Sequence, residues 1–295
     1  MINIPLVWTI LFSALLMAGN GADTCESLEI DQNKSSVAKV IELCSKEIAA
    51  SKKNAVAMYR LGLAYEKMGD YGSAYRWYMK SARLGYPKAY RELAMMVVFG
   101  QGVKRDEDLA FRLYLRATRP DNEKYFYDEE THTRSYSAEE LLKLHSRVSV
   151  GSLLEEAGRK NPDAYVHLGD AYLNGKYGAK KEKSKAFYWF LKGAKRKDAY
   201  ATIQLTKLCL DGTGRAEECA QAFDWNRELA EKGDAEAQYL TGVRFYKGQG
   251  VAKSDEEAVK WFEKSAEQKN RDAEYMLVMI YRVKKGPSAQ AEPAL

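Results

Sequence analysis

Few residues of this 295-residue chain have the types and spacing that catalysis needs. Its histidines, His132, His145 and His167, lie on separate segments, and no C-x-x-C or H-E-x-x-H motif assembles zinc ligands. The sequence also lacks a G-x-S-x-G nucleophile elbow and a G-x-x-x-x-G-K-[ST] phosphate loop. We therefore predict no catalytic residues, no cofactor and no metal site, and expect a protein that is not an enzyme.

The N-terminus has the composition of a secretory signal peptide. The run IPLVWTILFSALLMA at residues 4–18 is almost wholly apolar, and small residues follow it at positions 19, 21 and 22. The run is shorter than the roughly 20 apolar residues that span a bilayer. One departure from a typical signal peptide is that the preceding MINIP has no Lys or Arg. We predict a signal peptide over residues 1–22, a periplasmic mature chain and no stable membrane anchor after cleavage.

Export changes what the cysteines can do. The chain has four, Cys25, Cys44, Cys209 and Cys219, an even number that suits disulfides in an oxidising compartment. Of the three possible pairings, proximity in the sequence favours Cys25–Cys44 and Cys209–Cys219. The alternative is that Cys209 stays reduced as a small buried hydrophobe.

Acidic and basic residues are interspersed along the chain. The net charge is only +5, and no run of like charge is long enough for a nucleic-acid-binding arm. Proline is scarce, at 6 of 295 residues, which favours a mostly helical chain. We expect a helical protein with a solvated surface and no nucleic acid among its partners.

A spacing of 36 residues organises the second half of the chain. It superimposes four pairs of residues without a gap: Gly212 and Gly248, Gly214 and Gly250, Ala222 and Ala258, and Trp225 and Trp261. Apolar residues three and four apart predict two helices per unit, helix A and helix B, joined by a glycine turn and with Ser254 capping one helix B. Neither helix could bury its apolar face alone, so the units must stack.

Three segments in one unit carry a resemblance to a known family. Residues 235–239 (AEAQY), 248–251 (GQGV) and 258–261 (AVKW) resemble the Sel1-like repeat family, which is related to tetratricopeptide repeats. The resemblance implies an all-α fold, an α/α superhelical solenoid of helix pairs. From Gly62 to Ala74 is 12 residues, the tetratricopeptide spacing, whereas Gly242 to Ala258 is 16, the Sel1 spacing. The array is therefore expected to be mixed.

The repeats divide the chain into six segments. We predict a signal peptide over 1–22, an N-terminal capping half-repeat over 23–53, repeats 1–2 over 54–119, an irregular loop and degenerate repeat over 120–160, Sel1-like repeats and a final half-repeat over 161–285, and a disordered tail over 286–295. The alternative for 120–160 is an insertion loop followed by an extra helix.

Aromatic residues at fixed repeat positions are expected to be core. Trp189, Trp225 and Trp261 share one such position. In tetratricopeptide geometry the concave groove is lined by helix A residues between the core positions, and that mapping gives Tyr59, Glu66, Arg91, Met95, Asp170, Lys207, Tyr239, Tyr246, Tyr275 and Arg282.

A second candidate contact surface is the irregular connection over residues 121–137. It clusters aromatic and acidic residues, namely Tyr125, Tyr127, Asp128 and Glu129. The alternative is that these rings fold back and cover the gap between the flanking repeats.

The resemblance implies a non-enzymatic, protein-binding role. Exported Sel1 proteins include immunity proteins that neutralise type VI secretion lipase or phospholipase effectors, and this is the most specific expectation, with a secreted toxin effector as the partner. One alternative is an adaptor or regulator of a motor, secretion or signalling complex of the cell envelope. An alternative of another class is a weak hydrolase or β-lactam-binding Sel1 protein.

Overall fold

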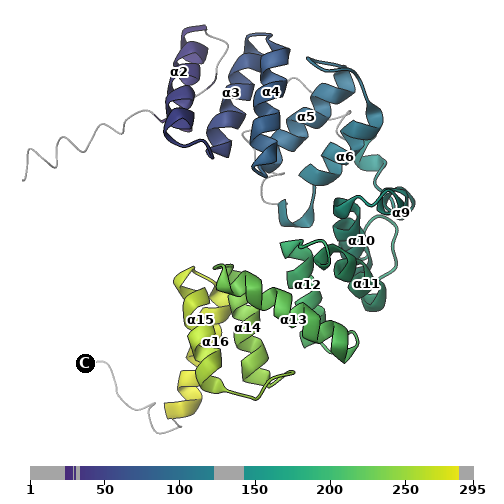
Figure 1. The fold of residues 1–295 in the computed structure, drawn as a ribbon, viewed down its shortest axis with the longest axis vertical. Coiled ribbons are helices and arrows are strands. Elements are labelled where there is room, and N and C mark those ends of the chain that lie inside the picture. The colour runs from purple at the N-terminus through teal and green to yellow at the C-terminus, as the bar shows by residue number, and fades with distance from the viewer. Residues whose placement is uncertain (1–23, 29, 31–33, 123–142, 286–295) are drawn as a thin grey trace, which may run out of the picture. The chain divides into compact units, whose positions relative to one another are not determined.

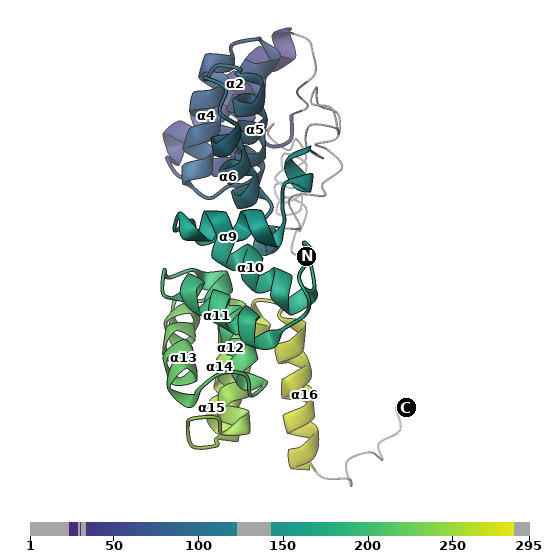
Figure 2. The same ribbon diagram turned by 90° about the vertical axis from the view of Figure 1, so that its right-hand side faces the viewer.

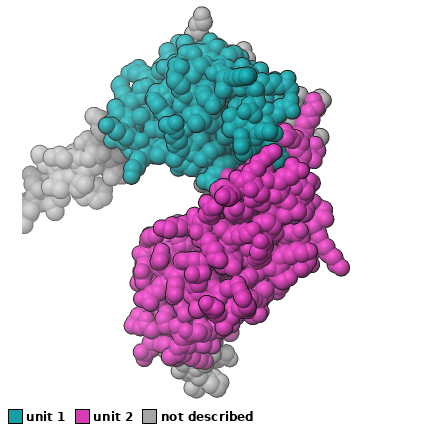
Figure 3. Space-filling view, turned by 45° about the vertical axis from the view of Figure 1, so that its right-hand side comes forward, with its two compact units in different colours: residues 1–118, 124–141 teal, residues 119–123, 142–295 magenta. Residues whose placement is uncertain are grey.

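The computed structural model describes residues 24–28, 30, 34–122 and 143–285, and within them the chain is built of helices and turns without a strand. This confirms the all-α prediction. The described residues form two compact units, which Figure 3 colours teal and magenta. Unit 1 comprises described residues up to Thr118, and unit 2 comprises residues 119–122 and 143–285. The predicted signal peptide, most of the 121–137 connection and the predicted tail lie outside the described residues.

Consecutive helices pack against one another within each unit (Figures 1 and 2). Because the most extensive contacts join consecutive helices and weaker ones join helices two apart in the chain, such as α12 and α14, the arrangement is that of a solenoid. Unit 1 contains α2 (Lys34–Ala50), α3 (Ala55–Lys67), α4 (Tyr71–Arg83), α5 (Pro87–Phe99) and α6 (Glu107–Ala117). Unit 2 contains the 3-10 helix η1 (Pro120–Asn122), α9 (Val150–Gly158), α10 (Pro162–Asn174), α11 (Lys183–Ala194), α12 (Ala199–Leu210), α13 (Ala216–Glu231), α14 (Ala235–Lys247), α15 (Asp255–Glu267) and α16 (Arg271–Lys285).

A glycine in helix A and a ring in helix B interlock in three of the pairs. A Cβ added to Gly62 would lie 2.4 Å from Cδ1 of Tyr78, and the same contact recurs at Gly169 with Phe190 (2.5 Å) and at Gly242 with Phe262 (2.6 Å). These rings are fully buried. The glycine is therefore required because the partner ring occupies the space of its side chain.

The tryptophans are not the core rings, contrary to the sequence prediction. Trp189 and Trp261 are only half-buried, and the fully buried ring is the next residue, Phe190 or Phe262. A lysine one turn later covers each tryptophan, with Nζ of Lys192 at 4.7 Å and Nζ of Lys264 at 4.4 Å from the ring centroid. The tryptophan position therefore lies at the margin of the core.

The turn between α14 and α15 forms as the residue types require. Gly248 ends α14 in the left-handed conformation with φ 70°, which a side chain would strain. Ser254 then caps α15, because its hydroxyl accepts a hydrogen bond from the amide of Glu257 at 3.1 Å. Both were predicted from the sequence.

Both predicted disulfides are formed, Cys25–Cys44 and Cys209–Cys219. The first ties the segment before α2 to α2 itself, and both of its cysteines are buried in the core that α2 shares with α3. The second joins α12 to α13 across their turn. Within the part of the chain that the structure describes, no helix has the length and apolar character that crossing a membrane requires.

Removing the first disulfide is expected to destabilise unit 1. The bond closes a loop with a sequence separation of 19, so a Cys25→Ser/Cys44→Ser variant should lose about 2–4 kcal/mol of unfolding free energy. Urea unfolding followed by circular dichroism measures this loss, after mass spectrometry has verified that Cys209–Cys219 is intact. An unchanged urea midpoint would show that the bond does not support the N-terminal cap.

Candidate protein-binding surface

Lys207, Glu236, Tyr239 and Tyr246 form a mixed polar and aromatic surface on unit 2, which we call the helix-A face. Lys207 lies on α12 and the others on α14, a helix that contacts α12. Nζ of Lys207 lies 2.8 Å from Oε1 of Glu236, and both side chains are partly exposed. This ion pair therefore links the two helices at the surface.

The two tyrosines of the helix-A face are half-buried and are held by neighbouring side chains. The Tyr239 ring lies 5.8 Å from the Phe262 ring, and Nζ of Lys253 lies 5.5 Å from the Tyr246 ring centroid. Burial, with a smaller effect of Asp272 and Glu236, raises the pKa of Tyr239. Its phenol therefore stays protonated at neutral pH and can donate a hydrogen bond to a partner.

The predicted row continues onto α16, where Tyr275 and Arg282 are exposed. Val278, Met279 and Tyr281 are exposed beside them, and Figure 2 shows α16 at the edge of unit 2. Val278 occupies the repeat position of Gly242, which in α14 faces the ring of its own helix B. At 48% exposure, Val278 shows that this face of α16 is open within the described residues.

Four of the predicted groove residues are buried instead of lining a surface: Tyr59, Arg91, Met95 and Asp170. Tyr59 packs against the Tyr78 and Tyr86 rings, and Nη2 of Arg91 lies 2.9 Å from Oε1 of Glu92. We therefore leave these four residues out of the helix-A face.

The remaining residues that were predicted to contact a partner do not belong to the helix-A face. Glu66 is half-buried and accepts a hydrogen bond from the hydroxyl of Tyr78. It therefore supports packing in unit 1. The predicted loop residues Tyr125, Tyr127, Asp128 and Glu129 lie outside the described residues, so the second candidate surface remains a prediction.

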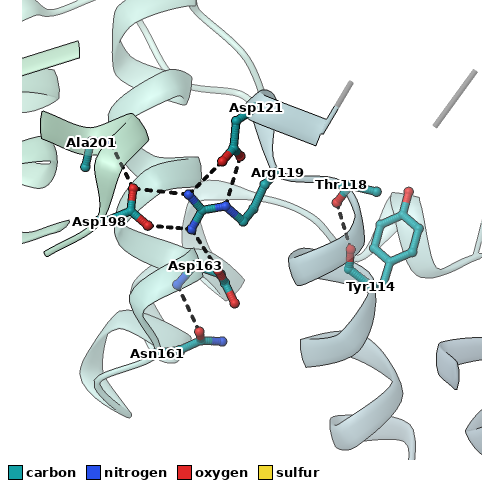
Figure 4. Close-up of polar contacts among 8 residues, drawn as sticks. All are labelled: Tyr114, Thr118, Arg119, Asp121, Asn161, Asp163, Asp198 and Ala201. Atoms are coloured by element: carbon teal, nitrogen blue, oxygen red, sulfur yellow. Dashed lines mark hydrogen bonds and ion pairs between the residues drawn. The ribbon is translucent and has the colours of Figure 1, made fainter. Parts of the chain in front are cut away.

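A buried cluster around Arg119 was not predicted (Figure 4). The guanidinium of Arg119 bridges three carboxylates: Nε lies 2.9 Å from Oδ1 of Asp121, and Nη1 lies 3.0 Å from Oδ1 of Asp163 and 2.8 Å from Oδ2 of Asp198. Asp198 also caps α12, since it accepts a hydrogen bond from the Ala201 amide at 2.8 Å. The cluster thus ties the starts of α10 and α12 together.

The charges of the cluster depend on one another. Burial alone would lower the pKa of Arg119, but its hydrogen bonds to Asp198 and Asp121 and their charges outweigh burial and raise that pKa above its ordinary value. One cation faces three carboxylates, so the guanidinium offsets much of their repulsion. We interpret the cluster as structural. Within the described part of the chain, no three His, Cys, Asp or Glu side chains are grouped so that they could hold a metal ion.

The family model of the Sel1 repeat matches the chain over residues 55–86, 87–119, 162–198 and 235–270. Each matched range begins at the start of a helix A and spans one helix pair. The chain is a Sel1 repeat protein. The Sel1 repeats coincide with the pairs α3–α4, α5–α6, α10–α11 and α14–α15, whereas the pair α12–α13 lies between two matched ranges.

Other proteins are similar to parts of this Sel1 repeat protein. An uncharacterized protein of Neisseria meningitidis serogroup B is 32% identical over 110 residues, which are 37% of this chain and 21% of that protein. The crystal structure of c5321, a protective antigen present in uropathogenic Escherichia coli strains, is 27% identical and covers 84% of this chain and 51% of its own, with a TM-score of 0.45. That of a Sel1 repeat protein from Oxalobacter formigenes is 22% identical and covers 88% and 95%, with a TM-score of 0.42.

The chain therefore spans about a fifth of the curated relative from Neisseria and about half of c5321. What those whole proteins do is not carried over to this Sel1 repeat protein. The packing of the Sel1 repeat accounts for the glycines and buried rings of the matched pairs. It does not account for the residue types on the helix-A face.

Proposed function

We propose that this Sel1 repeat protein is a non-enzymatic, protein-binding solenoid of the bacterial periplasm. The observation that carries the proposal is the helix-A face, where the partly exposed side chains of Lys207, Tyr239 and Tyr246 lie on two contacting helices at the margin of the core. Tyrosine provides a large contact area with few rotatable bonds, which is why it is enriched where proteins bind each other. The helices are fixed by their neighbours, so little conformational entropy is lost when a partner docks.

Two features support the periplasmic location. Residues 1–22 have the sequence of a secretory signal peptide. All four cysteines are paired in disulfides, which persist in oxidising compartments and are rare in the cytosol.

The most specific form of the proposal is an immunity protein. Its partner would be a secreted lipase or phospholipase effector of a type VI secretion system, which the protein would neutralise in the periplasm. This form rests on the export signal and on the resemblance to exported Sel1 proteins, and no single residue carries it. The competing form is an adaptor or regulator of a cell-envelope complex.

Capture of the partner tests the proposal. The tagged mature protein is incubated with a cell-envelope extract, and proteins retained after a high-salt wash are identified by mass spectrometry and remade in pure form. We expect a lipase or phospholipase that binds the pure protein and is toxic in the periplasm unless the two are co-expressed. A sensor kinase or secretion component as the sole direct binder would contradict the immunity role and support the adaptor role. Hydrolytic turnover by the protein itself, retained after every His is replaced, would contradict a purely binding function.

A further inference from the structure

The pair α12–α13 departs from the packing of the matched repeats. Thr206 and Asn226 replace the interlocking glycine and ring, and both are buried. The Thr206 hydroxyl donates to the Ala222 carbonyl at 3.4 Å, and Nδ2 of Asn226 donates to Oγ1 of Thr241 at 3.1 Å. Residues 199–234 also lie outside the ranges that the Sel1 model matches. A repeat unit that departs from the packing of its neighbours is a place where a functional site is expected.

A hollow of about 330 Å³ opens beside this pair. Its apolar wall comes from the Cys209–Cys219 disulfide and from Ala216, Ala220 and Phe223, and its other side comes from α14 and the turn after it. Small-molecule sites occupy roughly 300–1,000 Å³. The hollow is therefore at the small end of that range and suits a single residue better than a cofactor.

Arg244 lines this hollow at a repeat position that is otherwise apolar. The corresponding residues, two after the glycine position, are Ala64, Ala171, Leu208 and Ile280, and all of these are buried. Burial lowers the pKa of Arg244, partly offset by the charge of Asp224. A charged side chain at a core position costs free energy unless it is paired or hydrogen-bonded.

The guanidinium of Arg244 is held in place. Its Cζ lies 4.5 Å from the centroid of the Phe223 ring, Nε donates to the Gln249 carbonyl at 3.1 Å, and Nη2 donates to the Gly250 carbonyl at 3.3 Å. Neutral carbonyls do not balance its charge, the charge of Asp224 offsets burial only in part, and among the residues that the structure describes no carboxylate forms an ion pair with it. A fixed cation therefore stands at the edge of an apolar hollow.

We infer that this hollow binds the C-terminal residue of a polypeptide, with the α-carboxylate at Arg244 and an apolar side chain against the disulfide and Phe223. Arginine forms strong charge-assisted hydrogen bonds with carboxylates. The hollow presents a cation and an apolar wall side by side, which match a carboxylate and an apolar side chain on one residue. In a polypeptide, only the C-terminal residue carries both. The inference rests on the proposed function, because it states how part of a protein partner is recognised.

Isothermal titration of the mature protein with N-acetyl-alanyl-leucine tests the inference, with the C-terminally amidated peptide as the matched probe. We expect the free acid to bind at least about 10-fold more tightly than the amide, since a charged hydrogen bond contributes roughly 1.5–3 kcal/mol. Arg244→Gln should remove this preference. The control variant Arg105→Gln, whose guanidinium is exposed and paired with Glu107 in unit 1, should retain it.

A second variant keeps Arg244 and blocks the hollow. Ala220→Phe should abolish binding of the free acid while the helical content measured by circular dichroism is unchanged. Equal affinity for acid and amide would overturn the inference. Octanoate binding more tightly than the peptide would also overturn it, since the site would then take fatty acids.

The two proposals can fail separately. If a captured protein binds Arg244→Gln as tightly as the unmodified protein, the hollow is not used and the protein-binding function stands. If the peptide binds through Arg244 but no protein partner is found, the hollow stands and the proposed function fails.

Discussion

Replacing Arg119 with alanine is expected to lower the unfolding free energy of unit 2 by about 3–5 kcal/mol, the cost of removing one partner from a buried ionic cluster. The Arg119 side chain is 5% exposed, and those of Asp163 and Asp198 are 11% and 13% exposed. Without the guanidinium, these carboxylates would remain poorly solvated and would repel each other. The starts of α10 and α12 should therefore loosen first.

Native-state hydrogen exchange measures this effect locally. The amide of Ala201, which Asp198 caps, should exchange faster in Arg119→Ala by a factor that corresponds to the lost free energy. Arg227→Ala is the matched control, because its exposed pair with Glu231 should contribute less than about 1 kcal/mol. Equal protection in both variants would show that the cluster does not stabilise unit 2.

Gly169→Val should destabilise the pair α10–α11 by about 3 kcal/mol. The new Cβ would lie 2.5 Å from Cε1 of Phe190, whose ring is fully buried and cannot move outward without disturbing the core. Overpacking of this kind costs about 1–3 kcal/mol, and a branched side chain adds to it. Urea unfolding followed by circular dichroism provides the measurement.

Two further variants separate steric overlap from helix propensity. Gly158→Ala, on α9, adds a Cβ that meets nothing within 4 Å and should be neutral or stabilising by up to about 1 kcal/mol. The double variant Gly169→Val/Phe190→Ala should lose less unfolding free energy than the sum of the losses in the two single variants, because the clashing ring is gone. Additive losses would show that the clash is not the cause.

The 36-residue spacing predicted the fold because it reports positions that most of the helix pairs use in the same way. Gly169 and Gly242 show such a position, because the ring of the paired helix B occupies the space of the missing side chain at both. The spacing did not identify the buried ring, since Trp189 and Phe190 are adjacent and differ by only about 100° around the helix. A small rotation of the helix decides which of them enters the core.

The buried Arg119 cluster and the depth of the candidate site residues were less predictable, because both depend on contacts between distant residues. Arg119 meets Asp163 and Asp198 across 44 and 79 residues of sequence, and no local pattern reports such a contact. Tyr59 and Met95 share a register with exposed residues of unit 2, but the depth at which each one lies depends on its neighbours. Arg244 did have a signal in the sequence, because the 36-residue spacing aligns it with Leu208.

The affinity of the captured partner for a Tyr239→Ala/Tyr246→Ala variant tests the central claim most directly. Both rings are half-buried on the helix-A face, so the variant should keep its fold and lose its contact area. Tyr188→Ala is the matched control, since Tyr188 is exposed on a helix B, α11, outside that face. The measurement is isothermal titration of the purified partner into each protein.

The account predicts that the double variant binds the partner at least about 30-fold more weakly than the unmodified protein, as expected for two central tyrosines that each contribute more than about 1 kcal/mol. Tyr188→Ala should bind within about threefold of the unmodified protein. Unchanged affinity of the double variant, with its helical content intact, would contradict the claim that this Sel1 repeat protein binds through the helix-A face.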